Sequence, residues 1–183
     1  SFTITGLKDR ATFYIAVKSA DAFGNVSEIS NVVRAKTKDA VPPAAISDLQ
    51  VANIKSDTVT LKWTATGDDG NEGQAQVYDI RYAPDPITEE NWGSTQMVPV
   101  VPRPAKAGIP ETVTVTGLQP KTLYYFAVVA TDASGNVSPL SNVVDVLTAD
   151  TTPPPAITTL RVAKVADDSV ALTWFSPGND EYR

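Results

Sequence analysis

The stretch YYFAVVATDASGNVSPLSNVV at 124–144 decides the fold, because it is written twice: FYIAVKSADAFGNVSEISNVV occupies 13–33. Residues 1–38 match 112–149 at 18 of 38 positions, and residues 39–72 match 150–183 at 14 of 34, always at a shift of 111. Gap-free self-similarity of this length indicates a modular array. We expect a complete repeat at 39–149, the C-terminal part of a repeat at 1–38, and the N-terminal part of a third repeat at 150–183.

The repeat has the pattern of an all-β protein. Apolar residues alternate with polar or small ones in Val59-Leu61-Trp63 and in Tyr124-Phe126-Val128, which is typical of half-buried strands. Turn signals such as GDDGNEG at 67–73 separate these runs. We predict seven strands, near 46–53, 58–65, 76–83, 95–101, 112–117, 123–131 and 140–147. Since each sheet must hide one apolar face, seven short strands predict a two-sheet β-sandwich.

The composition excludes several kinds of function. The 183 residues are 42% hydrophobic and carry a formal net charge of −6, which suits a globular chain and argues against binding a phosphate backbone. The chain has neither Cys nor His, so it lacks a thiolate nucleophile, disulfides, a Ser-His triad and ordinary His/Cys metal sites. No apolar run approaches the roughly 20 residues of a membrane span, and no membrane insertion is expected.

These patterns resemble the fibronectin type III module. The resemblance lies in a Trp on the second strand, an alternating aromatic third strand and a tyrosine corner: Trp63 and Trp174; Tyr78, Ile80 and Tyr82; Leu118, Pro120, Thr122 and Tyr124. It implies tandem immunoglobulin-like β-sandwiches, and the DASGNVSPLSNVV hairpin is similar to versions in secreted bacterial proteins. The first copy has Phe13 in place of Tyr124 and Asp9 in place of Pro120, so its corner should lack the hydroxyl bond.

Proline-rich segments join the repeats. They read KTKDAVPPAA at 36–45 and LTADTTPPPAI at 147–157. Consecutive prolines favour an extended polyproline conformation, which makes a semi-rigid spacer. We therefore expect the repeats to be held apart in a string.

The loop GDDGNEG at 67–73 is the candidate metal site. It brings together the oxygen ligands of Asp68, Asp69, Asn71 and Glu72, which Ca²⁺ prefers. The same residues are also those that tight turns select, and the loop lacks EF-hand spacing. The third copy reads Gly178-Asn179-Asp180-Glu181, which is also acidic. We assign no metal or cofactor to the chain.

The hairpin turns at Asp21–Asn25 and Asp132–Asn136 are candidate recognition loops. Their Gly residues suit positive φ and their Asp residues can cap the turn, so turn chemistry explains them without a partner. Asn25 and Asn136 also begin matches to the N-glycosylation sequon.

Trp92, with Tyr125, is a candidate platform for stacking on a sugar ring. We favour the alternative that Trp92 folds over the edge of the sandwich, since large indoles usually find apolar cover. Glu89 and Glu90 are adjacent, which does not suit the paired carboxylates of a glycosidase. Arg103 and Lys106 lie in a segment too sparsely charged for nucleic acid. We expect no catalytic residues.

The sequence is best explained as an extracellular or cell-surface spacer whose partners are the neighbouring modules of a longer chain. One alternative is a module that binds polysaccharide or a surface protein beside a secreted hydrolase. Another is a filament subunit that self-associates through exposed strand edges.

Overall fold

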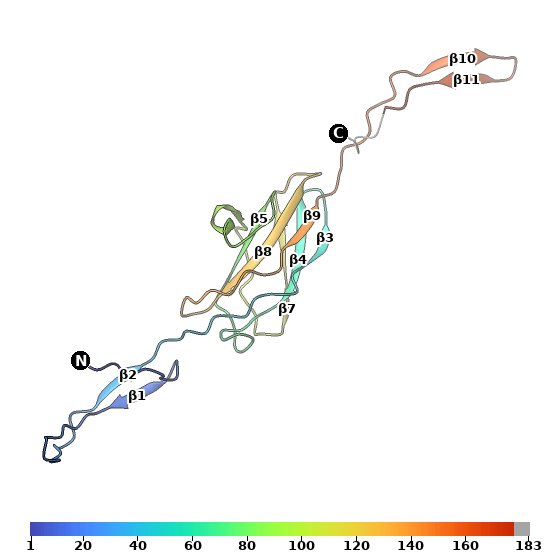
Figure 1. The fold of residues 1–183 in the computed structure, drawn as a ribbon. Coiled ribbons are helices and arrows are strands. Elements are labelled where there is room, and N and C mark those ends of the chain that lie inside the picture. Colours follow the sequence, from blue (N-terminus) through green and yellow to red (C-terminus); the bar gives the residue numbers. More distant parts are fainter. Residues whose placement is uncertain (178–183) are drawn as a thin grey trace.

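A β-sandwich forms the centre of the chain, and one β-hairpin extends from each end of it (Figure 1). The computed structural model describes residues 1–177. One sheet of the sandwich has the order β3-β4-β7 and the other β6-β5-β8-β9. The strands are β3 (Gln50–Ile54), β4 (Thr58–Thr64), β5 (Val77–Ala83), β6 (Gln96–Met97), β7 (Pro110–Thr116), β8 (Leu123–Thr131) and β9 (Val144–Leu147). The predicted all-β, two-sheet fold is confirmed.

The two hairpins lie in the segments before and after the sandwich. β1 (Thr12–Ile15) pairs with β2 (Val33–Lys36), and β10 (Arg161–Val165) pairs with β11 (Val170–Thr173), both antiparallel. The helical content of the described residues is one short 3₁₀ turn, η1 (Trp92–Ser94), in the connection from β5 to β6. Within residues 1–177 there is no helix of the length and apolarity that crossing a bilayer requires.

Three of the predicted strands are shorter than the sequence suggested. β3 begins at Gln50, because the Asn142 side chain takes the place of ladder bonds at Leu49: the Leu49 amide donates to Asn142 Oδ1 at 2.9 Å. β6 covers only Gln96–Met97, since the segment that follows is rich in prolines, which cannot donate to a ladder.

β9 begins at Val144 because, in the residues before it, two serine hydroxyls accept hydrogen bonds that backbone carbonyls would accept in a regular strand. The Ser141 hydroxyl accepts a hydrogen bond from the Val128 amide, and the Ser138 hydroxyl accepts one from the Ala130 amide, both at 2.9 Å. The chain thus stays beside β8 without forming a regular strand there.

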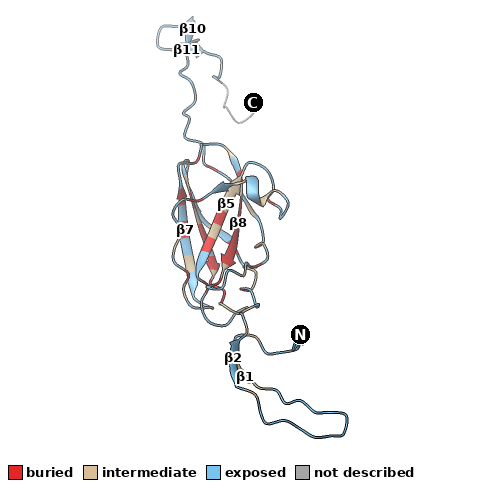
Figure 2. Cartoon of the chain, turned by 90° about the vertical axis from the view of Figure 1, so that its left-hand side faces the viewer, coloured by how far each residue is buried: buried red, intermediate tan, exposed pale blue. Residues whose placement is uncertain are grey.

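The core lies between the two sheets of the central sandwich (Figure 2). Leu61, Ile80, Phe126 and Val128 are fully buried, as their alternation predicts. Trp63 packs edge-on against Tyr78 with ring centroids 5.3 Å apart. Burial of a large side chain of this kind stabilises a fold by roughly 1.5–3 kcal/mol.

The predicted tyrosine corner is present in the central sandwich. The Gln119 amide donates a hydrogen bond to the Tyr124 hydroxyl at 3.1 Å. This bond ties the start of β8 to the turn before it, which carries Lys121. Phe13 in the first copy has no hydroxyl to accept the equivalent bond.

The chain enters and leaves the sandwich at opposite poles (Figure 1). At the first pole, Pro43 is buried and forms an isolated β-bridge with Gly70 through its two neighbours. The Gly70 amide donates to Pro42 O and the Ala44 amide donates to Gly70 O, both at 3.0 Å. The linker before β3 is thus held by hydrogen bonds to the loop at 67–73 as well as by its prolines.

Candidate functional site

The site is the joint between the first hairpin and the sandwich, and the loop at 67–73 forms one wall of it. The Asp68 and Asp69 amides both donate to Glu72 O, at 2.8 and 3.1 Å, which curls the loop tightly. Gly67 is required for this curl, since a Cβ there would overlap the Glu72 backbone. The loop therefore presents two successive carboxylates at the pole where the linker arrives.

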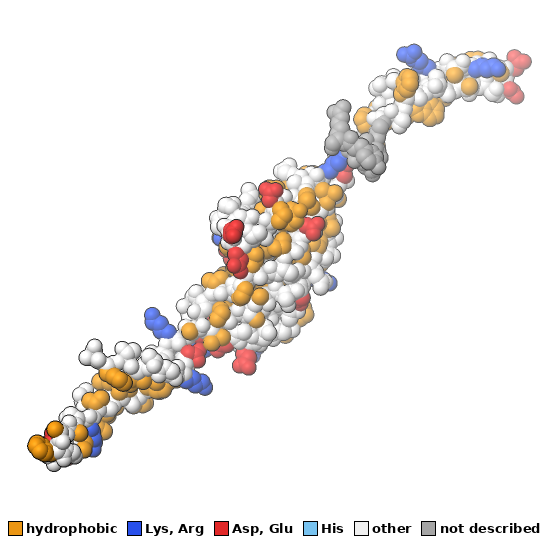
Figure 3. Space-filling view, viewed as in Figure 1, with side chains coloured by type: hydrophobic (Ala, Val, Ile, Leu, Met, Phe, Trp, Pro, Cys, Tyr) orange, Lys and Arg blue, Asp and Glu red, His pale blue; other side chains and the backbone are white. Residues whose placement is uncertain are grey.

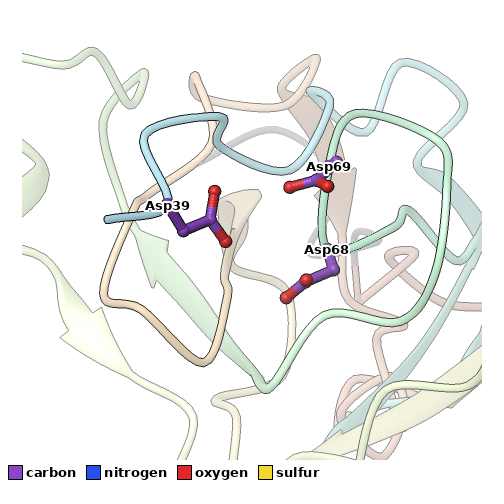
Figure 4. Close-up of side chains that lie close together, drawn as sticks. All are labelled: Asp39, Asp68 and Asp69. Carbon is purple, nitrogen blue, oxygen red and sulfur yellow. The ribbon is translucent and has the colours of Figure 1, made fainter. Parts of the chain in front are cut away.

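Asp39 joins these carboxylates from the linker. Its side chain is only 6% exposed. The hairpin turn between β8 and β9 holds it in place, because the Ser134 hydroxyl donates to Asp39 Oδ2 at 3.2 Å and Asn136 Nδ2 to Asp39 O at 3.5 Å. We call Asp39, Asp68 and Asp69 the acidic cluster (Figure 4). One carboxylate oxygen from each of the three lies within 4.8 Å of the others.

Arg10, from the turn before β1, reaches into the acidic cluster. Its Nη1 lies 2.8 Å from Asp68 Oδ2, 2.7 Å from Asp69 Oδ2 and 3.4 Å from Asp39 Oδ2. The hydrogen bond to Asp68 and the charges of Asp69 and Asp39 raise the pKa of Arg10. Desolvation raises the pKa of Asp69 despite Arg10, and the neighbouring carboxylates Asp39 and Asp68 add to this rise. The cluster is thus a crowded set of like charges that one guanidinium partly neutralises.

Thr37 fixes the turn from which Arg10 projects. Its hydroxyl donates to Lys8 O at 2.7 Å and accepts from the Ala11 amide at 3.0 Å, so the turn stays beside the end of β2. Arg10 itself has φ of +49°, in the left-handed region that few residues with side chains adopt. This conformation places Arg10 next to the linker that carries Asp39.

The second joint repeats this arrangement 111 residues later. Thr148 donates to Gln119 O at 2.6 Å and accepts from the Thr122 amide at 2.9 Å. Lys121, at φ of +51°, forms an ion pair with Asp150 at 3.2 Å. Lys121 and Asp150 are the counterparts of Arg10 and Asp39. The counterparts of Asp68 and Asp69 are Asn179 and Asp180, which lie outside the described residues, as does the whole acidic stretch 178–181.

The structure changes the candidate calcium set. Asp68 and Asp69 come together as expected, but the side chains of Asn71 and Glu72 are exposed and do not belong to the acidic cluster. Sequence reasoning missed Asp39, because it lies in a linker 29 residues before Asp68. The signal that could have found it is the recurrence of a basic residue and an aspartate at 10 and 39 and at 121 and 150.

The two hairpin turns use the same internal bonds. Asp132 Oδ1 accepts from the Ser134 and Asn136 amides, and Oδ2 accepts from Asn136 Nδ2 at 2.7 Å. Asp21 makes the corresponding bonds to the Phe23 amide and to Asn25. Asn25 and Asn136, the two sequon residues, are therefore both hydrogen-bonded to the aspartate of their own turn.

These bonds lower the pKa of both turn aspartates. For Asp21 the hydrogen bonds from Asn25 are the main cause. For Asp132, burial would raise the pKa, but the hydrogen bonds from Asn136 and Ser134 together outweigh it and the net pKa is lowered. Both carboxylates are thus structural acceptors within their turns.

Trp92 is half-buried on the outer face of the four-stranded sheet. Arg81 lies over its ring, with the guanidinium carbon 5.0 Å from the centroid, and donates from Nη1 to Trp92 O at 2.9 Å. With Glu89, Val129 and Leu140 it lines a recess of about 180 Å³. Trp92 therefore covers the outward-facing Val129, not the open end of the core.

The other residues singled out from the sequence do not gather at this recess. Tyr125 is four positions before Val129 on β8, about 13 Å away at the usual rise of an extended strand. Glu90, Arg103 and Lys106 are exposed, and Glu89 lies at the rim of the recess. Among residues 1–177, neither a pair of carboxylates nor an aromatic pair comes together at this recess.

The two antiparallel sheets define this protein as an immunoglobulin-like β-sandwich protein. More specifically, the chain belongs to the fibronectin type III family, whose domain model matches residues 43–146.

Its relatives include large enzymes. It is 33% identical to chitinase A1 of Niallia circulans over 165 residues, which are 87% of this chain and 21% of that protein. It is also 33% identical to exoglucanase B of Cellulomonas fimi, over 95% of this chain and 15% of that protein. The chain thus spans about a fifth or less of the length of these relatives.

Among solved structures, the chain is similar to the crystal structure of the chicken CNTN1 FN1-FN3 domains, with a TM-score of 0.50 over 79% of this chain and 45% of that one. At 19% sequence identity, this likeness concerns the fold alone.

Proposed function

We propose that this chain is a non-catalytic spacer of an extracellular protein, composed of repeats at 1–38, 39–149 and 150–183. The observation that carries the proposal is that the linkers join the complete module at opposite poles (Figure 1). Modules connected in this way extend end to end, and each adds about 30 Å if it is as long as the nine-residue β8.

The relatives support an accessory role. In the chitinase and the exoglucanase, the matched region is 21% and 15% of the protein, which leaves most of each chain for other domains. Chitin and glucan polymers are too large to enter a cell, so enzymes with these names suit an extracellular setting. Neighbouring modules of a longer chain are the partners that a spacer requires.

The spacer proposal is tested by measuring the distance between the two hairpins. The chain has no native Cys, so Glu28→Cys and Asp168→Cys provide two specific sites for a donor and an acceptor dye. We expect one population of low transfer efficiency, and an elongated envelope by small-angle X-ray scattering. High transfer efficiency, from hairpins folded back on the sandwich, would contradict the spacer.

A second candidate function is polysaccharide binding at Trp92, which the half-exposed ring and its neighbour Arg81 favour. The test is retention of the chain on insoluble cellulose or chitin. A spacer is not retained. Retention that Trp92→Ala abolishes and Trp174→Ala preserves would assign binding to this face, because Trp174 is also exposed, at 52%, but lies on a hairpin.

A further inference from the structure

We infer that the acidic cluster is a docking surface for the preceding repeat, and that the basic residue of that repeat's corner turn is what it recognises. In this chain Arg10 and the acidic cluster form the first such joint. The inference rests on the proposed spacer for its purpose, and it adds the contact that would fix the angle between one repeat and the next.

The charge balance of the acidic cluster is the first argument. Three carboxylates that converge within 4.8 Å repel one another, and a module that carries them is destabilised until a cation arrives. Arg10 supplies that cation through a single nitrogen placed among all three. Because a guanidinium stays charged at any ordinary pH, the basic side of the contact does not titrate.

The rigidity of both sides is the second argument. Asp39 is held by Ser134 and Asn136 of the sandwich, whereas the turn of Arg10 is held by Thr37. Asp39 is nearly buried, and Arg10, whose side chain is 44% exposed, projects from a turn fixed by hydrogen bonds. Such preorganisation is what distinguishes a specific contact from the exposed ion pairs that contribute little.

The recurrence is the third and independent argument. Lys121 and Asp150 form the same contact at the second joint, from a turn with the same left-handed backbone and the same threonine bonds. Two joints of one chain thus place a basic residue of one repeat on the first linker aspartate of the next. The partner that fits the acidic cluster is therefore a preceding repeat with Arg or Lys at this turn.

The test measures the spread of distances across the first joint in the full chain. Spin labels at Glu28→Cys, on the first hairpin, and Glu90→Cys, on the sandwich, report this distance by pulsed electron paramagnetic resonance. We expect a narrow distribution in the parent chain. Arg10→Gln should broaden it at least about twofold, since the linker alone then connects the two parts. Arg34→Gln, which removes an exposed arginine from the same hairpin, is the matched control and should leave it narrow.

Three further measurements keep the inference falsifiable if Arg10→Gln disturbs its own turn. Asp68→Asn with Asp69→Asn changes only the sandwich side and should broaden the distribution as well. About 1 M salt, where the Debye length falls to about 3 Å, should broaden the parent chain and change the Arg10→Gln chain little. Arg10→Lys should keep the distribution narrower than Arg10→Gln.

A broad distribution in the parent chain, or one that none of these changes affects, would overturn the docking inference. So would a change on adding Ca²⁺ alone that Asp68→Asn abolishes, because the acidic cluster would then be a metal site. These outcomes differ from failure of the spacer, which appears as a short distance between Glu28→Cys and Asp168→Cys whatever the width at the first joint.

Discussion

The same hairpin sequence occurs in two settings in this molecule, and the difference between them separates local from non-local structure. The turns Asp21–Asn25 and Asp132–Asn136 have the same pattern of internal hydrogen bonds. After each turn, two serine hydroxyls accept hydrogen bonds in place of backbone carbonyls: Ser27 and Ser30, and Ser138 and Ser141. Yet Val17 is 66% exposed, whereas its counterpart Val128 is fully buried. The backbone pattern follows from the local sequence alone, but the core does not.

The other end of the chain shows the same contrast. Trp174 and Leu172 are 52% and 50% exposed on the β10-β11 hairpin, whereas Trp63 and Leu61 are 2% and 0% exposed on β4. Apolar side chains accordingly gather on the surface of both hairpins (Figure 3). In the part of the chain that the structure describes, each hairpin lacks the facing sheet that covers the sandwich core, and both lack a counterpart of β5, the strand that pairs with β8 along its whole length and brings Tyr78 and Ile80 into the core. An amphipathic hairpin therefore buries its apolar face only when the opposite sheet is present.

The largest contrast in stability is expected when each of these tryptophans is replaced by alanine in turn. Trp63→Ala should destabilise the sandwich by about 3–5 kcal/mol, because it empties a buried aromatic site. Trp174→Ala should change stability by less than about 0.5 kcal/mol, as an exposed substitution does. Urea unfolding monitored by far-ultraviolet circular dichroism measures both. Equal losses would show that the two environments are not different in solution.

The tyrosine corner offers a smaller test. Tyr124→Phe removes the acceptor of the Gln119 amide and should cost about 1–2 kcal/mol, since that partly buried donor loses its partner. Phe13→Tyr supplies the missing hydroxyl on the first hairpin and should leave the unfolding midpoint of the sandwich unchanged. If Phe13→Tyr raised that midpoint, the hairpin and the sandwich would unfold as one unit.

The smallest expected effect is a change in acid sensitivity. The pKa of Asp132 is lowered in the folded chain, so its contribution to stability is present above its ordinary pKa and is lost as the pH falls through the lower folded value. Asp132→Asn should therefore be less stable than the parent near neutral pH, and the difference should shrink below about pH 4. Asp21→Asn is the control and should leave thermal unfolding of the sandwich unchanged at every pH. A difference for Asp132→Asn that stayed constant with pH would show that its carboxylate does not titrate with folding.

Most of the fold could be predicted from sequence, because its causes are local or periodic. The alternation of Tyr124, Phe126 and Val128 sets the inward face of β8, and the gap-free repeat sets the module length. The ends of β3 and β9 could not be predicted, since Asn142, Ser138 and Ser141 replace ladder bonds with side chains from other segments. A pattern of apolar residues carries no information about such substitutions.

The acidic cluster was only half predictable. Asp68 and Asp69 are neighbours in one loop, so the sequence shows them together. Asp39 and Arg10 reach the same place from a linker and from another repeat, and their approach depends on the turn held by Thr37. Asn71 and Glu72 of the candidate calcium loop do not join the acidic cluster, because the loop curls through its backbone and leaves their side chains exposed.

The left-handed backbone of Arg10 and Lys121 has a practical consequence for anyone engineering this protein. Glycine is the residue that this backbone conformation favours. A design that maximises the melting temperature of one module would therefore place glycine at both positions. The resulting module would have a higher melting temperature, but the joint between modules would be less rigid. The substitution removes the side chain that contacts the next module. At these two positions, the thermal stability of one module and the alignment of successive modules therefore favour different residues.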